Sequence, residues 1–119
     1  MIELEEIRFD GARPVEGYGP GFFRIGGAVL RGNVLVTPEA ARLWSGPEDM
    51  ASLLALAGKV DVLLYGTGAM MGRAPAAMVS ALGDLGIGVD AMASNAAART
   101  YNVLLSEGRR VAAALLAVD

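Results

Sequence analysis

Residues 60–68, Val-Asp-Val-Leu-Leu-Tyr-Gly-Thr-Gly, constrain the fold of this chain more than any other segment. The apolar run is too short for a helix and is followed by glycines, which is typical of a strand buried on both faces. We therefore expect residues 60–65 to lie in the middle of a sheet. Small molecules bind beyond the carboxyl ends of such strands in open α/β sheets, so Gly66, Thr67 and Gly68 are candidate site residues.

Composition narrows the chemistry that is open to the protein. With 119 residues the chain has the length of one domain and can bury roughly two-thirds of its unfolded surface. It contains no Cys and no His, the residues most used for zinc, thiol nucleophiles and near-neutral acid–base catalysis. We expect no cofactor and no metal, name no catalytic residue, and favour a protein that is not an enzyme.

The charge pattern argues against nucleic acid and the membrane interior. The net charge is −3, and the ten cations are scattered without a basic run, whereas phosphate binding needs clustered positive charge. The longest apolar run, residues 111–118, is well short of the roughly 18 residues of a spanning helix. Glutamates at positions 3, 5 and 6 occupy the place where a signal peptide carries positive charge, so we expect a cytoplasmic protein.

The first third of the sequence favours strands. Residues 2–9 alternate imperfectly between apolar and charged side chains, as an edge strand does, and an exposed edge permits a homodimer. Residues 14–21 are rich in Gly and Pro around Tyr18 and predict an irregular segment. Short apolar segments separated by Gly26-Gly27 and Gly32-Asn33, which suit hairpin turns, then predict a small antiparallel meander. The three strands expected there are Phe22–Ile25, Ala28–Arg31 and Val34–Val36.

Helical signals dominate the remainder. Thr37 before Pro38 has the pattern of a helix start, Pro75 suits a first helical position, and Ser94 with Asn95 suits a cap. The expected helices are 37–44, 48–57, 76–85 and one from the Ser94–Asn95 cap to about residue 107; the expected later strands are 87–91 and 109–118. The predicted fold is a single α/β domain spanning residues 1–119: a mixed β-sheet with an amino-terminal antiparallel meander and a βαβαβ core flanked by helices.

The last third carries a resemblance to a known family. Its motif residues here are Met92, Arg99, Thr100, Tyr101, Asn102, Glu107, Gly108 and Arg109. Gly17-Tyr18-Gly19, Trp44 and Gly66-Thr67-Gly68 also match. The chain resembles the small single-domain family of unknown biochemical function that includes mitochondrial respiratory complex I assembly factor three and the adipogenesis-associated single-domain protein.

This resemblance implies a function in assembly. The mitochondrial relatives help to build a membrane enzyme complex, and bacterial relatives tend to be encoded near the protein-export translocase. We therefore expect a non-catalytic interaction module with protein partners, either subunits of a membrane-bound complex or export machinery. The family has no established catalytic residues, so none is carried over.

A second hypothesis is a small-molecule or anion-binding domain. Two parallel strands that end near residues 65 and 91 present their following loops at one edge of the sheet. A capped helix amino terminus at Ser94, with Arg99 on that helix and Arg73 on the glycine loop, would attract a carboxylate or phosphate there. The hypothetical anion pocket consists of Gly66, Thr67, Gly68, Arg73, Ser94 and Arg99.

Several of these residues also have ordinary structural interpretations. The spacing of Gly66, Gly68 and Gly72 is one residue longer than a dinucleotide fingerprint, so a tight turn is favoured over nucleotide binding. Arg99 and Asn102 lie on a polar helical stripe that is either solvated or functional. Tyr18 is an interface anchor or a loop plug, and with Asn102 it is a candidate interaction residue. For Arg109, an ion pair with Glu107 is favoured over a ligand contact.

Overall fold

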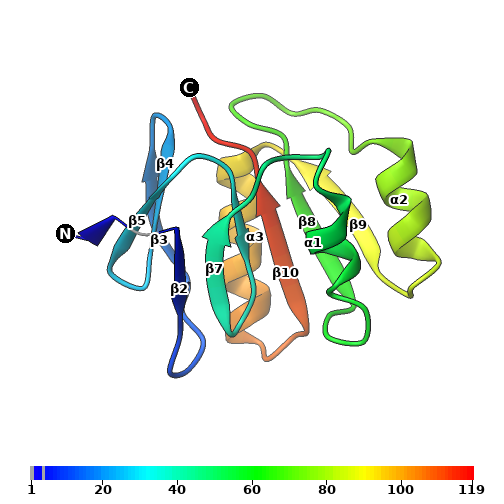
Figure 1. Cartoon of the computed structure of the whole chain (residues 1–119), viewed down its shortest axis with the longest axis horizontal. Coiled ribbons are helices and arrows are strands. Elements are labelled where there is room, and N and C mark those ends of the chain that lie inside the picture. Colours follow the sequence, from blue (N-terminus) through cyan, green and yellow to red (C-terminus); the bar gives the residue numbers. More distant parts are fainter. Residues whose placement is uncertain (1, 4) are drawn as a thin grey trace.

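The computed structural model describes residues 2–3 and 5–119, which form two sheets and three helices (Figure 1). The strands are β1 (Ile2–Glu3), β2 (Glu6–Arg8), β3 (Val15–Gly19), β4 (Phe22–Ile25), β5 (Ala28–Arg31), β6 (Val34–Val36), β7 (Ala40–Leu43), β8 (Val62–Gly66), β9 (Gly88–Met92) and β10 (Val111–Leu115). The helices are α1 (Met50–Leu54), α2 (Ala76–Gly83) and α3 (Ser94–Ser106).

The two sheets have different characters. The large sheet has the strand order β2-β7-β6-β10-β8-β9, antiparallel from β2 to β10 and parallel from β10 to β9. The small sheet has the order β1-β5-β4-β3, in which only the β1–β5 pair is parallel. The predicted α/β class is confirmed, and β8-α2-β9-α3-β10 forms the expected βαβαβ core. The antiparallel meander consists of β3, β4 and β5 instead of the expected β4, β5 and β6, because β6 pairs within the large sheet.

The strand predicted at 60–65 is β8, and it lies mid-sheet as expected. It pairs in parallel with β10 on one side and β9 on the other, each over five residues. Leu63, Leu64 and Tyr65 are buried, with at most 3% of any of them exposed. Because both edges of β8 are paired and both of its faces are covered, none of its side chains has to face water, and this explains the continuous apolar run.

Strand β10 confirms the prediction of a final strand and takes the central position in the large sheet. It is antiparallel to β6 and parallel to β8, so it joins the two halves of the sheet. Ala112, Ala113 and Ala114 have no exposed area. Their small side chains let layers pack closely on both faces, and the need for pairing on both edges overrides the helical preference of alanine.

Two apolar layers cover the large sheet. On one face, α3 and the small sheet pack against alternate residues such as Val36, Leu64 and Leu115. On the other face, α1 and α2 pack against Leu35 and Tyr65 and their neighbours. Figure 1 shows α1 in front of the sheet, α3 behind it and the small sheet to the left. The helices on the α1 side reach over β8 and β9 but leave β2 and β7 uncovered there.

Asn102 joins α3 to the small sheet. Its Oδ1 accepts a hydrogen bond from the backbone N–H of Val15 at 2.8 Å, and its Nδ2 donates to the Val15 carbonyl at 3.0 Å. One amide side chain thus satisfies both backbone groups of a residue in β3. This pairing fixes the position of β3 on the helix in the way that a neighbouring strand would.

The prediction of an irregular segment at 14–21 was wrong, because residues 15–19 form β3. The strand pairs antiparallel with β4 and carries a bulge between Val15 and Gly17. Gly and Pro lower the local strand preference, but pairing with β4 and the Asn102 contact supply the missing stabilisation.

The predicted helix at 37–44 was also wrong, because this segment forms a hairpin turn and β7. Thr37 Oγ1 accepts hydrogen bonds from the N–H groups of Glu39 and Ala40 and so stabilises a turn instead of a helix start. Thr-Pro-Glu suits both structures, since Pro favours a first helical position and also the second position of a β-turn. Pairing of β7 with β6 and β2 decides between them.

Other boundaries differ in smaller ways. Gly32-Asn33 is not a hairpin turn within one sheet, because β5 and β6 belong to different sheets. The strand expected at 2–9 divides into β1 and β2, again in different sheets, and its residue 4 lies outside the described residues. The helix expected at 48–57 has regular structure only over Met50–Leu54, capped by Asp49.

The expected helix cap at residues 94 and 95 was wrong by one position. Ala93 occupies the cap position of α3 and makes no side-chain hydrogen bond to the helix. Ser94 is already helical, and Asn95 Oδ1 accepts only from its neighbour Ala96. The Ser94 hydroxyl is used elsewhere, as described below.

We predict that Asn102→Ala destabilises the fold by about 1–3 kcal/mol, because two hydrogen bonds are lost and the Val15 N–H and carbonyl lose their partners. Asn95→Ala is the control, since among the described residues the Asn95 side chain bonds only to the N–H of the next residue. Urea denaturation of both variants tests this. Equal losses in the two would show that the Val15 contact contributes nothing specific.

A second prediction concerns Tyr101, whose ring is fully buried and whose hydroxyl has no hydrogen-bond partner within the described ranges. Burial raises the pKa of the Tyr101 phenol well above its ordinary value, about 10. Because the folded-state pKa is the higher one, this contribution to stability is complete below about pH 10 and is lost progressively as pH rises above it.

Tyr101→Phe should therefore shift alkaline unfolding, followed by circular dichroism, to higher pH. At pH 7 it should leave stability unchanged or raise it by about 1 kcal/mol, because an unpaired buried hydroxyl is removed. Tyr18→Phe, at an exposed position, serves as the control. A clear loss of stability at pH 7 would mean that the Tyr101 hydroxyl is bonded after all.

Candidate functional site

The carboxyl edge of β8 brings together four of the residues proposed for an anion pocket, Gly66, Thr67, Gly68 and Ser94. Ser94 Oγ accepts a hydrogen bond from the Gly68 N–H at 2.9 Å and donates one to the Leu116 carbonyl at 2.6 Å. Ser94 has no exposed area. The hydroxyl thus connects the glycine loop, α3 and the segment after β10, so both its proton and an acceptor position are used inside the protein.

Gly66 is needed here for space and not for flexibility. A Cβ at Gly66 would lie 2.7 Å from Ser94 Oγ and 2.9 Å from both Ser94 Cα and Leu115 Cδ2. The Thr67 hydroxyl also bonds within the protein, because Oγ1 lies in donor position 2.6 Å from the Met70 carbonyl oxygen and 3.2 Å from that of Met92. Close packing at Gly66 and a φ of +92° at Gly68 account for the two glycines of the Gly-Thr-Gly pattern without a ligand.

The remaining residues proposed from sequence lie apart from this cluster. Arg73 and Arg99 are exposed, and within the described part of the chain no hydrogen bond or ion pair joins them to the Gly66–Ser94 contacts. Tyr18 is 43% exposed on β3. The side chain of Asn102 is occupied by Val15. The anion pocket at this edge stays a prediction, and no contact within the described residues assembles it.

A larger hollow lies elsewhere, over the half of the large sheet that α1 and α2 leave uncovered. It is a cleft of about 710 Å³ with an apolar floor that includes Leu35 of β6 and Leu56 and Val60 after α1. Its lining continues around the turn at Thr37 to Leu105 near the end of α3. Its volume is in the range that binding sites for small molecules and peptide side chains occupy.

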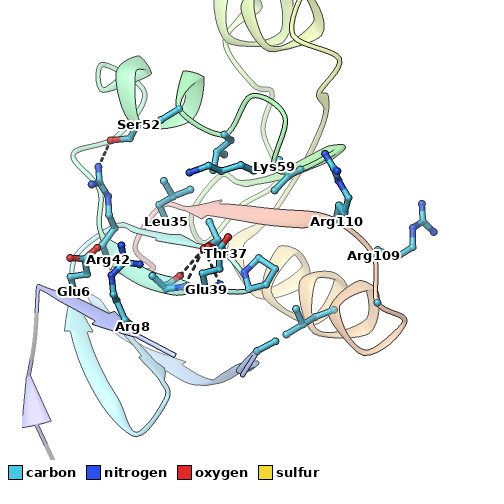
Figure 2. Close-up of a pocket in the computed structure, with 18 of the residues that line it drawn as sticks. Glu6, Arg8, Leu35, Thr37, Glu39, Arg42, Ser52, Lys59, Arg109 and Arg110 are labelled. Carbon is cyan, nitrogen blue, oxygen red and sulfur yellow. Dashed lines mark hydrogen bonds between the residues drawn. The ribbon is translucent and has the colours of Figure 1, made fainter. Parts of the chain in front are cut away.

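Charge is concentrated around this cleft. Five of the ten cations in the chain line it, together with two carboxylates, so the lining carries +3 while the whole chain carries −3. The cations are Arg8, Arg42, Lys59, Arg109 and Arg110, and the carboxylates are Glu6 and Glu39. Figure 2 shows Arg8 and Arg42 at one end, Arg109 and Arg110 at the other, and Lys59 above Leu35 between them.

Two of the five cations are held by the protein itself. Arg42 donates a hydrogen bond to Ser52 Oγ and lies 3.9 Å from Asp49 Oδ2. Hydrogen bonds from the hydroxyl and N–H of Ser52 lower the pKa of Asp49 below its ordinary value. Arg110 lies 3.5 Å from Asp61 and donates to the Gly58 carbonyl at 2.9 Å. These contacts hold one cation at each end of the cleft.

The side chains of the other three cations, Arg8, Lys59 and Arg109, are exposed and make no ion pair or hydrogen bond with any other described residue. The ion pair expected between Glu107 and Arg109 is therefore not formed within residues 2–3 and 5–119, and Arg109 lines the cleft instead. Their charges are available to a partner.

Sequence reasoning did not find this cleft. Its cations are scattered along the chain and meet only because β2, β7, β6 and β10 are neighbours in the sheet. The one local signal was the alternation around Ile7, which predicts a solvent face for Glu6 and Arg8. The same alternation in β7, with Arg42 outward and Ala41 buried, was hidden by the mistaken helix.

Two features are absent from the part of the chain that the structure describes. Across the described ranges, no group of three or more acidic residues lies close enough together to hold a metal ion. None of the helices in that part of the chain has the length and apolar character that crossing a membrane requires. What the cleft offers is positive charge on both sides of an apolar floor.

The structure defines a class of protein: a small α/β domain with a mixed sheet, a second antiparallel sheet and a cation-lined cleft. The chain belongs to the family described as "Protein of unknown function (DUF498/DUF598)", whose model matches residues 15–116.

Relatives support the fold and the family. The chain is 56% identical to an uncharacterised protein of Rhodobacter capsulatus over 111 residues, which cover 93% of this chain and 90% of that one. It is 32% identical to NADH dehydrogenase [ubiquinone] 1 alpha subcomplex assembly factor 3 of Danio rerio over 109 residues, which cover 86% of this chain and 63% of that protein. A crystal structure described as an outer membrane protein from Bartonella henselae superposes with a TM-score of 0.84 at 38% identity, covering 93% of this chain and 99% of that one.

We predict opposite effects for two Gly→Ala changes. Gly66→Ala should destabilise the fold by about 1–3 kcal/mol, because the new Cβ collides with Ser94 backbone atoms that cannot move away freely. Gly83→Ala, in α2 with open space around it, should be neutral or stabilise by up to about 1 kcal/mol. Thermal unfolding of both variants tests the pair. A Gly66→Ala protein as stable as the parent would mean that the edge has room for a ligand.

Proposed function

We propose that this protein is a non-catalytic interaction module that acts in the assembly or biogenesis of membrane-bound complexes, in the manner of a respiratory complex I assembly factor. Its partners would be subunits of such a complex or components of the export machinery, and it would work in the cytoplasm. The observation that carries the proposal is the cation-lined cleft, a surface equipped for binding that contains no catalytic group we can name.

The assembly role draws its support from the Danio rerio relative, whose name is that of an assembly factor. This chain spans 63% of the length of that protein, so the role of the whole relative is transferred here only as a proposal. The cleft adds support that is independent of the name. Arg8, Lys59 and Arg109 make no ion pair within the described residues and lie around an apolar floor, which is an arrangement that a protein partner can complete.

A second candidate function is a small-molecule or anion-binding domain, without the assembly role. The volume of the cleft, about 710 Å³, favours it because metabolite sites have this size. A screen of the pure protein against a metabolite mixture distinguishes the two, since only this candidate requires a small molecule that binds with micromolar affinity or better.

The assembly function predicts two results in the organism that encodes the protein. Affinity capture of the tagged full chain under mild conditions should enrich subunits of one membrane-bound complex or of the export translocase, identified by mass spectrometry against an untagged strain. Native gels of membranes from a deletion strain should show subassemblies of that same complex. If the deletion strain assembles all its membrane complexes at the normal rate and nothing is enriched, the proposal fails.

A further inference from the structure

The lining of the cleft is unusual for this chain because its charge opposes that of the rest of the molecule. The lining carries +3 and the remaining residues carry −6, but two of those negative charges, Asp49 and Asp61, pair with Arg42 and Arg110 of the lining. The cleft together with these two carboxylates therefore carries +1, and the rest of the molecule carries −4. A negatively charged partner is therefore attracted to this face and repelled from the others. The sign of the charge narrows the partner to an acidic one.

The arrangement of the cations further limits the kind of partner that fits the cleft. Across the large sheet the order is Arg8 on β2, Arg42 on β7, Leu35 on β6 and Arg110 immediately before β10. Positive charge thus lies at both ends of an apolar floor, as Figure 2 shows. A lipid-like molecule with one anionic head would neutralise only one end. A nucleic acid would bring a continuous row of phosphates, and between the two ends of the cleft a single lining cation, Lys59, would meet them.

We propose that the cleft binds an acidic segment of a partner protein, with carboxylates at both ends and apolar side chains between them. This inference rests on the proposed function, since it identifies the kind of partner segment that the module recognises. The apolar side chains lie over Leu35, Leu56 and Val60. The carboxylates pair with Arg8 at one end and with Arg109 at the other, and Lys59 contributes charge between them.

The spacing of the strands sets the distance between the two acidic ends of the bound segment. From β2 to β10 there are three inter-strand steps of about 4.8 Å each, or roughly 14 Å in total. An extended peptide covers this distance in about four residues, and a helix in about ten. Arginine suits the two ends because its planar fork can bind both oxygens of a carboxylate.

The test uses the full chain as bait for a displayed library of random twelve-residue peptides. We expect enriched peptides with acidic residues on both sides of an apolar pair. Peptides synthesised from the enriched set should lose affinity by about tenfold or more for the triple variant Arg8→Ala, Lys59→Ala, Arg109→Ala, measured by fluorescence polarisation. The affinity for the parent should fall as salt is raised from 50 to 300 mM, because exposed charge pairs are screened.

The matched control is the triple variant Arg24→Ala, Arg73→Ala, Arg99→Ala. It removes the same charge from exposed arginines outside the cleft lining and includes both cations of the anion pocket predicted from sequence. It should bind the enriched peptides within twofold of the parent. All six changes are at exposed side chains, and the single variant Lys59→Ala provides a further test if either triple variant unfolds.

Other outcomes overturn the inference. Enriched peptides without acidic residues, equal losses in the two triple variants, or no enrichment above the bare support would each do so. If vesicles of phosphatidylglycerol bind the chain through the same three cations while acidic peptides do not, the cleft recognises a membrane surface. If the triple variant Arg8→Ala, Lys59→Ala, Arg109→Ala still captures complex subunits as the parent does, the peptide site is rejected while the assembly function stands.

Discussion

The insertion of β10 between β6 and β8 is the interaction on which the rest of the structure depends. It provides backbone partners for an antiparallel neighbour on one side and a parallel neighbour on the other. Without it, the antiparallel strands β2, β7 and β6 on one side and the parallel strands β8 and β9 on the other would each present an unpaired edge. Because β10 comes last in the chain, both halves of the large sheet are joined only by contacts between distant residues, which are costly to form in chain entropy.

The position of β10 also affects where the surface of the large sheet is open. The carboxyl ends of the parallel strands and the face of the antiparallel half differ in this respect. Beyond the carboxyl ends of the parallel strands, the chain continues from β10 through Leu116, whose N–H bonds to the Gly66 carbonyl and whose carbonyl accepts from Ser94. At this edge of the sheet, where many α/β proteins bind a ligand, these hydrogen bonds join the end of the chain to β8 and α3. The cation-lined cleft lies instead over the antiparallel half, where the short α1 leaves the sheet face open.

Local patterns predicted those elements whose signals had one interpretation. The three strands of residues 22–36 were placed correctly because short apolar runs between glycine turns fit little else, and α2 and β9 follow from Pro75 and Gly86. Thr37-Pro38-Glu39 had two interpretations, and local sequence does not contain the β6 pairing that selects the turn. The anion pocket at the end of β8 stays a prediction, and Ser94 and Gly66 pack closely against each other there. The cleft was not predicted, because Lys59 and Arg109 carried no local sign that they line the same surface.

The sequence by itself determined the α/β class, the buried β8 strand and the absence of thiol and imidazole chemistry, because composition and periodicity act within a few residues. Only the tertiary structure decided that residues 15–19 and 40–43 are strands, that Asn102 holds β3, and that five cations scattered between Arg8 and Arg110 line one cleft. The physical reason is that strand pairing joins residues far apart in the chain. The strand order that places β2, β7, β6 and β10 side by side is what brings those charges together.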